Sequence, residues 1–191
     1  MNEPKFTTRE QWMMFIANQM RPMFDTVQAP LPERFRVTMS LTKRKKAIGV
    51  CYHPDCSGDQ TYEILIRLDQ ADPMEVAAVL AHELVHSAVG LEHGHKGEFK
   101  RVALEIGLEG KMTNTVAGDL FKSSVKKILE DAGTFPHAVL DWNGKKSGPK
   151  KQGTRMKKTE CAECGYTVRV TDKWLEIGPP SCPEHGSMQV V

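Results

Sequence analysis

The sequence has no apolar run that approaches the roughly 20 residues a helix needs to span a bilayer. Its first ten residues lack a basic segment followed by an apolar stretch, so we expect no secretory signal peptide. Cysteine is scarce, with five among 191 residues. We therefore expect no membrane partner and a reducing compartment, cytoplasmic or associated with a nucleoid or nucleus. The protein is not expected to be secreted, and its cysteines should be thiols or metal ligands rather than disulfides.

Acidic residues are missing from residues 142–159, which carry seven lysines and arginines. The whole chain has a net charge of only +2, so the remainder sums to −5. Three glycines and one proline interrupt regular structure there, so we interpret residues 144–158 as a basic flexible linker. Two uses stay open: a solvated tether, or a segment whose cations bind nucleic-acid phosphates. The candidate contacts are Lys145, Lys146, Lys150, Lys151, Arg155, Lys157 and Lys158.

Length and composition set the expected domain organisation. The hydrophobic fraction of 40% and the charged fraction of 26% are ordinary for a globular protein. A chain of 191 residues can form one domain with a hydrophobic core and one small appendage. The basic linker separates the two, so we expect a larger domain over residues 1–143 and a smaller one over residues 159–191.

Hydrophobic periodicity predicts one helix and three strands in the first part of the chain. Thr7 and Glu10 form a capping-box pattern before an amphipathic stretch, so we expect a helix over residues 8–27. Alternating apolar residues predict a strand over residues 35–41. Two more strands, over residues 47–52 and 62–68, are expected around the turn HPDCSGDQ.

A longer helix with clear start and end signals follows these strands. Asp72 is its expected N-cap, Pro73 suits the first helical position and Glu75 fits a capping box. Gly90 suits the position after the last turn. The apolar stripe that should face the core consists of Val76, Val79, Leu80 and Leu84.

The last turns of this helix carry the pattern HELVH. His82 and His86 are four residues apart and share one helix face, so both can direct a ring nitrogen at one metal ion. Zinc is expected because imidazole is among its usual ligands. Glu83, about 100° further round the helix, can accept a proton from a zinc-activated water that attacks a peptide carbonyl. We therefore assign Glu83 as a catalytic base.

A catalytic zinc needs a third protein ligand, which the spacing alone leaves open. Metzincin proteases have a histidine six residues after the second one and a glycine three residues after it. Glu92 and Val89 occupy those positions here, so that pattern fails. Glu92 also follows too soon to match proteases that take a glutamate ligand from a separate helix. His93 and His95 remain as candidates.

The stretch from HELVH to GHKGEF resembles the SprT-like (Spartan) zinc metalloproteases. In that family a short loop follows the His-Glu-x-x-His motif and leads to a histidine with an aromatic residue four positions later. His95 has Phe99 at this offset, whereas His93 has Gly97. The resemblance therefore assigns His95 as the third ligand and leaves His93 in the loop. Gly94 and Gly97 would let the loop fold back, and a new helix is expected from Phe99.

The resemblance covers most of the chain, including the RKKAIGVCY strand and the GTFPHAVL segment. It implies an α+β fold of zincin type, with a small antiparallel or mixed sheet packed on the active-site helix. It also implies that the substrates are proteins bound to DNA or crosslinked to it. The basic linker and the sequence TKRKK at residues 42–46 fit non-sequence-specific, phosphate-dominated DNA binding. We expect a monomer.

The C-terminal region carries a second metal-binding pattern. Cys161 and Cys164 form a Cys-x2-Cys pair, and Cys182 and His185 form a Cys-x2-His pair, with 17 residues between the pairs. The segments TVRV and KWLEI between them are expected to be short strands. So small a module cannot build a large core, so zinc would hold it folded as a zinc ribbon. We therefore expect two zinc ions per chain, one catalytic and one structural.

Several alternatives stay open. Cys51, His53 and Cys56 could bind metal or be redox-active, or the cysteines could be free thiols. His137 could orient a substrate or simply be packed. Two rival functions are a non-catalytic nucleic-acid-binding or transcription-associated zinc protein, and a zinc amidase of deformylase type. Glu83 argues against the first, since a structural zinc needs no such carboxylate. The missing glycine-rich and cysteine motifs of deformylases argue against the second.

Overall fold

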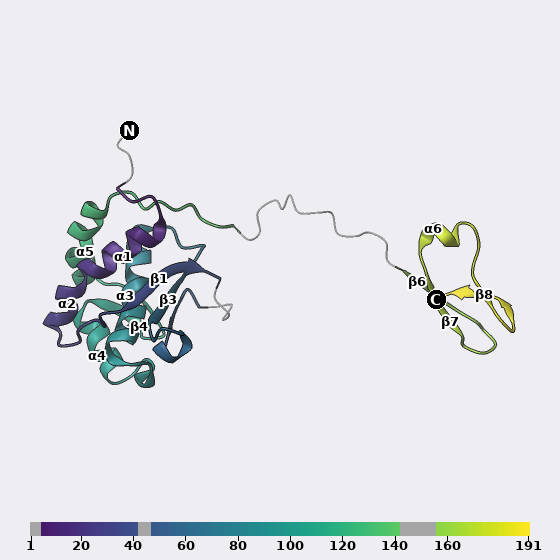
Figure 1. Cartoon of the computed structure of the whole chain (residues 1–191), viewed down its shortest axis with the longest axis horizontal. Coiled ribbons are helices and arrows are strands. Elements are labelled where there is room, and N and C mark those ends of the chain that lie inside the picture. The colour runs from purple at the N-terminus through teal and green to yellow at the C-terminus, as the bar shows by residue number, and fades with distance from the viewer. Residues whose placement is uncertain (1–4, 42–46, 142–155) are drawn as a thin grey trace. The chain divides into compact units, whose positions relative to one another are not determined.

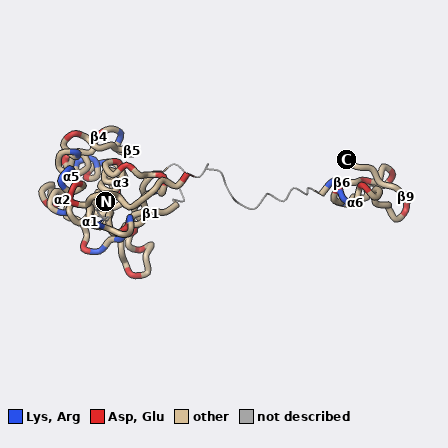
Figure 2. Tube along the Cα trace, turned by 90° about the horizontal axis from the view of Figure 1, so that it is seen from above, with Lys and Arg blue, Asp and Glu red and all other residues tan. Residues whose placement is uncertain are grey.

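The computed structural model describes residues 5–41, 47–141 and 156–191, which fold into mixed helices and strands of the α+β class. The chain divides into two compact units, Met1–Trp142 and Asn143–Val191 (Figure 1). Lysines and arginines are interspersed with acidic residues along the described part of each unit (Figure 2). None of the described helices has the length and apolar character needed to cross a membrane.

Two helices open the first unit, where the sequence predicts one. α1 spans Arg9–Gln19 and α2 spans Arg21–Thr26. The prediction of a continuous helix is wrong because Pro22 has no amide N–H to donate to the carbonyl one turn earlier. The N-cap is also one residue later than expected. Thr8 accepts the Gln11 amide N–H, and the Gln11 side chain accepts the Thr8 amide N–H.

A three-stranded mixed sheet forms one layer of the first unit. The strand order is β1 (Phe35–Ser40), β3 (Tyr62–Arg67) and β2 (Gly49–Tyr52). β1 runs parallel to β3, and β2 runs antiparallel to it. The 3-10 helix η1 (Pro54–Cys56) lies in the connection from β2 to β3. β2 is therefore an edge strand, and within the described residues no strand pairs with its outer side.

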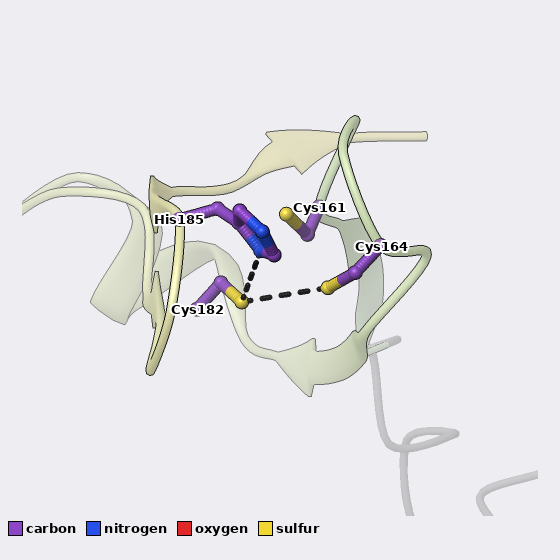
Figure 3. A group of neighbouring side chains, drawn as sticks. All are labelled: Cys161, Cys164, Cys182 and His185. Atoms are coloured by element: carbon purple, nitrogen blue, oxygen red, sulfur yellow. Dashed lines mark hydrogen bonds between the residues drawn. The ribbon is translucent and has the colours of Figure 1, made fainter.

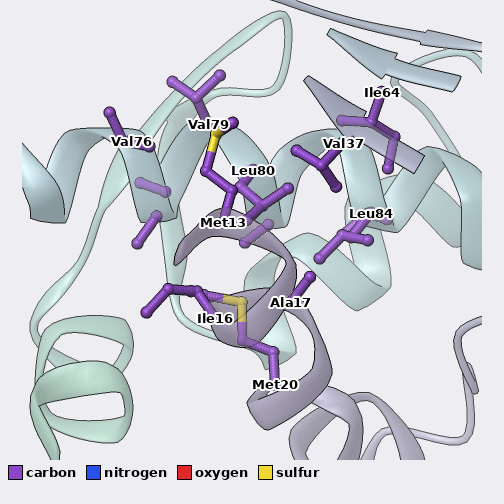
Figure 4. Close-up of a cluster of buried hydrophobic side chains, with 14 of the residues drawn as sticks. Met13, Ile16, Ala17, Met20, Val37, Ile64, Val76, Val79, Leu80 and Leu84 are labelled. Atoms are coloured by element: carbon purple, nitrogen blue, oxygen red, sulfur yellow. The ribbon is translucent and has the colours of Figure 1, made fainter. Parts of the chain in front are cut away.

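The central helix α3 spans Pro73–Val89 and begins and ends as the sequence predicts. The Asp72 carboxylate accepts the Glu75 amide N–H at 2.9 Å, and Gly90 is the C-cap. α1 and the sheet pack against α3, which buries its apolar stripe in a shared core (Figure 4). The labelled part of that core is Met13, Ile16, Ala17, Met20, Val37, Ile64, Val76, Val79, Leu80 and Leu84.

The elements after α3 fold back onto it. The 3-10 helix η2 (Leu91–His93) and helix α4 (Glu98–Glu105) come first, and α4 was expected from the sequence. A β-hairpin of β4 (Leu108–Lys111) and β5 (Asn114–Ala117) follows, and then helix α5 (Asp119–Ala132). Sequence analysis predicted neither the hairpin nor α5. Both β5 and α5 contact α3, so α3 packs against these elements as well as against α1 and the sheet.

The segment after α5, residues 133–141, is held against the first unit without forming a helix or strand. The Trp12 indole N–H donates to the Gly133 carbonyl at 3.1 Å, and Phe135 packs against Trp12 with tilted rings whose centroids are 4.5 Å apart. His137 Nδ1 accepts from Arg9 at 3.2 Å, so its Nε2–H donates to the Leu68 carbonyl at 3.0 Å. His137 thus fastens this segment, which agrees with the packed alternative.

The second unit consists of short elements around two small sheets. The first sheet has the order β10 (Gln189–Val190), β6 (Lys157–Glu160) and β7 (Thr167–Val170), all antiparallel. The second is the hairpin of β8 (Ser181–Cys182) and β9 (Gly186–Ser187). A short helix, α6 (Asp172–Leu175), lies between β7 and β8 in sequence.

Two sequence predictions for this unit need correction. The segment KWLEI is not a strand, because α6 begins at Asp172 and includes its first residues. The Leu175 and Glu176 amides donate helical hydrogen bonds to the carbonyls of Thr171 and Asp172. Its large side chains Trp174 and Ile177 are exposed, so the segment has no buried apolar face of the kind that stabilises a strand. β6 starts at Lys157, inside the predicted linker, so Lys157 and Lys158 belong to a strand.

Candidate metal centres

The first candidate metal centre lies on the last turns of α3. His82 and His86 project from one face of the helix, as their spacing requires. The His82 side chain is almost entirely buried, and Glu83 beside it is only 5% exposed. The His86 side chain is partly buried. The helix thus delivers three polar side chains to one place.

His95 reaches the same place from the loop between η2 and α4. Gly94 and Gly97, close to it on either side, have φ angles of +52° and +51°, which residues with side chains rarely adopt. The loop can therefore turn back toward α3 within a few residues. His93 lies outside the cluster, and its Nε2 is 4.0 Å from the Glu92 carboxylate. The structure thus brings His95, and not His93, to His82 and His86.

The spacing of the three imidazoles fits a tetrahedral metal ion. His95 Nε2 lies 3.3 Å from His82 Nε2 and 3.3 Å from His86 Nε2. Zinc–nitrogen bonds of about 2.0–2.1 Å in a tetrahedron place two ligand nitrogens about 3.3–3.4 Å apart. All three ligand atoms lie within 4.8 Å of one another. The donor set therefore fits zinc, while the identity and number of bound ions stay predictions.

Phe99, at the start of α4, forms a floor beneath the three imidazoles. Its ring centroid lies 4.9 Å from that of His82, 4.4 Å from His86 and 5.0 Å from His95. Phe99 has no exposed surface. One buried aromatic ring therefore fixes the orientation of all three candidate ligands by packing.

Thr115 of β5 is a neighbour of the cluster that sequence analysis missed. Its Oγ1 lies 2.9 Å from His82 Nδ1, the ring nitrogen that faces away from His95. By contrast, His86 Nδ1 is buried and has no hydrogen-bond partner among the described residues. A threonine in a short strand, 33 residues away from His82, carries no ligand pattern that sequence could reveal.

Burial sets the protonation state of the imidazoles. It lowers the pKa of His82 to about 3, with further lowering from His86 and His95. Burial and the neighbouring His95 lower the pKa of His86 to about 4. The pKa of His95 is also lowered by burial. All three rings are therefore neutral near pH 7 and offer lone pairs to a cation, as metal ligation requires.

Glu83 and the imidazoles line a cavity of about 760 Å³. The strand β2, the tip of the β4–β5 hairpin and the η2–α4 loop form its other walls. Gly49 of β2 lies tightly against Glu83, since a Cβ built on it would be 2.5 Å from Glu83 Oε1 and 2.8 Å from Val79 Cγ1. The absence of a side chain at Gly49 therefore lets β2 pass close to the carboxylate.

Cys51, His53 and Cys56 also line this cavity but lie outside the histidine cluster. Burial raises the pKa of the Cys51 thiol strongly, and the nearby Glu83 carboxylate raises it further. The thiol is therefore protonated near pH 7 in the absence of a metal ion. The Cys56 side chain is exposed, and His53 Nδ1 interacts with Asp55 two residues later. These facts favour free thiols.

The second candidate centre is formed by four side chains of the second unit: Cys161, Cys164, Cys182 and His185 (Figure 3). Cys182 Sγ lies 3.6 Å from Cys164 Sγ and 3.6 Å from His185 Nδ1. A tetrahedral zinc with bonds of about 2.3 Å to sulfur and 2.0–2.1 Å to nitrogen gives edges of about 3.8 and 3.6 Å. The pKa of Cys182 is lowered to about 6, chiefly by a backbone hydrogen bond from Glu184. The group thus fits zinc as a Cys3His site.

The predicted nucleic-acid contacts are only partly visible. Lys145, Lys146, Lys150, Lys151 and Arg155 lie outside the described residues, as does the basic segment 42–46. Lys157 and Lys158 in β6 form ion pairs with Asp172 and Glu160. Comparisons with protein-family models, curated proteins and solved structures find no match to this chain.

Proposed function

We propose that this chain is a zinc-dependent metalloendopeptidase of SprT-like type that acts on DNA-associated or DNA-crosslinked proteins. One observation carries the proposal: three histidine Nε2 atoms converge beside the buried Glu83 carboxylate at the wall of a cavity. A purely structural zinc needs neither a cavity nor an adjacent carboxylate. The arrangement therefore favours chemistry on a bound molecule.

The residues of the centre divide the catalytic work. His82, His86 and His95 would hold the metal, and a bound zinc supplies the acidity of a water molecule and the polarisation of a carbonyl. Glu83 accepts the proton of the attacking water and then donates it to the amine that leaves the cleaved peptide bond. Gly49 and Val79 pack against Glu83 and limit where its carboxylate can lie. The hydroxide thus ends in the new carboxyl group and the proton in the new amino group.

The cavity wall supports a peptide as the substrate. β2 borders the cavity, and among the described residues its outer edge pairs with no other strand. An extended peptide can add to such an edge through main-chain hydrogen bonds, which are largely independent of sequence. A peptide bound along β2 would pass the Glu83 carboxylate, because Gly49 of the same strand contacts it. This geometry suits broad protein substrates better than one small molecule.

The DNA part of the proposal rests on charge. The stretch 142–159 holds seven cations and no acid, which suits phosphate binding without sequence readout. Lys157 and Lys158 would add less to phosphate binding than two unpaired lysines, because each is paired with an acidic side chain. The five other cations of the linker are then the main candidates.

The second unit is proposed to be a zinc ribbon with a structural ion. Its four ligand atoms come from two pairs, one at the turn between β6 and β7 and one at the β8–β9 hairpin. A metal ion there joins two hairpins that share little apolar contact. Together with the histidine centre this gives two zinc ions per chain.

The deformylase-type alternative finds less support. It requires an upstream cysteine as the third ligand, but Cys51 lies outside the group formed by His82, His86 and His95. His95, rather than a cysteine, completes the group with His82 and His86. We therefore retain the peptidase as the proposed function.

The decisive experiment replaces Glu83 by glutamine in the zinc-loaded full chain. Glu83→Gln keeps the side-chain size but removes the proton acceptor, so cleavage of a DNA-bound or unfolded protein should fall by roughly 10²–10⁴-fold. DNA is present in the assay, and elemental analysis should still find two zinc ions. Glu92→Gln, an exposed carboxylate in the adjacent loop, is the matched control and should cleave normally.

Two outcomes would contradict the proposal. Equal cleavage by wild type and Glu83→Gln would show that this carboxylate is not the base. A wild type that holds both zinc ions yet leaves DNA-bound and unfolded substrates intact would favour the non-catalytic zinc protein instead.

A further inference from the structure

The β4–β5 hairpin places one polar side chain against the histidine cluster. Thr115 is 9% exposed, and its Oγ1 is 2.9 Å from His82 Nδ1. We propose that Thr115 is a positioning residue that fixes the tautomer and the ring orientation of His82 for metal binding. This inference rests on the proposed use of the cluster as a metal centre. It assigns a role to an element that the histidine motif does not include.

The chemistry of the imidazole explains what the hydroxyl does. A neutral histidine carries one ring proton, and a nitrogen that bears it cannot bind a metal. If Nδ1–H donates to Thr115 Oγ1, the lone pair of His82 lies on Nε2, which is 3.3 Å from His95 Nε2. A hydroxyl can also donate a hydrogen bond, so without metal either tautomer is possible. Metal at Nε2 selects the tautomer in which Thr115 accepts.

The two helix histidines differ in this respect. His82 has the Thr115 hydroxyl behind it, whereas His86 Nδ1 is buried with no partner among the described residues. A partner on the distal nitrogen orients a ligand ring and raises its basicity. His86 is held by packing on Phe99 instead, at a centroid distance of 4.4 Å. The hairpin therefore contributes directional bonding to one ligand only.

The local structure of the hairpin directs Thr115 inward. Thr115 pairs with Gly110 across the hairpin, and β5 packs on α3. Its neighbour Val116 alternates to the other face and is 55% exposed. Val116 thus offers a control position on the same strand that points away from the cluster.

The test measures metal affinity in the full chain. Thr115→Val keeps the shape but removes the hydroxyl, and Thr115→Ser keeps the hydroxyl. Competition against a zinc chelator should show roughly 10–100-fold weaker binding at the histidine centre for Thr115→Val. Thr115→Ser and the control Val116→Thr should bind like wild type. Zinc release from the Cys3His centre should be the same in all variants and serves as the internal reference.

A second measurement needs no variant and covers the case in which Thr115→Val does not fold. In zinc-loaded wild type, the His82 side chain should show a protonated Nδ1 in nitrogen-15 NMR spectra. That proton should exchange slowly and lie close to the Thr115 methyl group. A His82 that is protonated at Nε2, or whose Nδ1 proton exchanges freely, would overturn the inference, as would wild-type zinc affinity in Thr115→Val.

These results are distinct from a failure of the proposed function. Weakened zinc binding in Thr115→Val, with rescue by serine, supports the inference even if wild type cleaves no protein. Normal cleavage by wild type together with unchanged zinc affinity in Thr115→Val would leave the peptidase proposal intact and remove only the role of Thr115.

Discussion

The two candidate metal centres differ in what surrounds them. His82, His86 and His95 lie against a large apolar core that includes α1, α3 and the three-stranded sheet. The Cys3His centre lies in a unit whose buried apolar cluster consists of Cys161, Cys182 and Met188. Two of those three residues are themselves candidate ligands. In the first unit the fold positions the candidate ligands, whereas in the described part of the second they are two of the four buried residues, beside Thr159 and Met188.

This difference leads to opposite roles for the metal. A preformed site surrounded by a packed core can lose its ion and keep its shape, because burial of apolar surface stabilises the fold on its own. A module with almost no core has little to offset the conformational entropy of its chain. Metal binding there is a large part of the folding free energy. The same ion would be a reagent in one unit and a structural support in the other.

The largest expected effect is on the fold of the second unit. Cys182→Ser should unfold residues 156–191, because structural zinc contributes an apparent ~10–16 kcal/mol in small zinc modules. Loss of NMR signal dispersion in this unit would report it, while the thermal unfolding of the first unit should not change. Cys56→Ser, an exposed cysteine outside both centres, is the control and should alter neither unit. A second unit that stays folded in Cys182→Ser would show that the comparison is mistaken.

The next effect is loss of one ion without loss of fold. His95→Ala should remove the zinc of the first unit, because two helix ligands alone leave the site incomplete. Elemental analysis should then find one zinc per chain, and circular dichroism should show native helix content. His93→Ala is the matched control, since His93 lies two residues away and outside the cluster. Zinc lost in His93→Ala and kept in His95→Ala would reverse the assignment of the third ligand.

The smallest effect concerns the close contact between β2 and α3. Gly49→Ala places a methyl group 2.5 Å from Glu83 Oε1, so the carboxylate or the strand must move. Overpacking of this kind costs about 1–3 kcal/mol. Chemical denaturation should show that loss, while zinc content stays at two. Gly58→Ala adds a methyl group that meets nothing within 4 Å and serves as the control. Equal stability of the two variants would mean that β2 can yield without strain.

The sequence predicted the parts of the fold whose signals are local. The ends of α3 were predictable because its capping residues, Asp72 and Gly90, directly flank the helix in sequence. The helix over residues 8–27 was too long because the amphipathic pattern continues through Pro22, which interrupts the hydrogen bonds. Apolar periodicity therefore indicates which side is buried more reliably than where an element stops.

The rest of the site depends on contacts distant in sequence. Thr115 contacts His82 because the hairpin packs on α3, and no pattern in the sequence of residues 108–117 predicts that contact. Spacing alone left His93 and His95 open, because both lie in the same loop. The positive φ angles of Gly94 and Gly97 decide how the loop returns. Patterns thus pointed to His82 and His86 on one helix face but not to the neighbours that contact them.

The segment over residues 133–141 has a practical consequence for dissecting the chain. A truncation placed at the end of α5 would remove Phe135 from Trp12 and break the Trp12–Gly133 hydrogen bond. It would also expose the Leu68 carbonyl, which accepts from both His137 and Leu140. An expression boundary for the isolated first unit therefore belongs after Asp141, beyond the last helix. A protease that cuts before that point would yield a weakened fragment, whereas one that cuts after it would release an intact one.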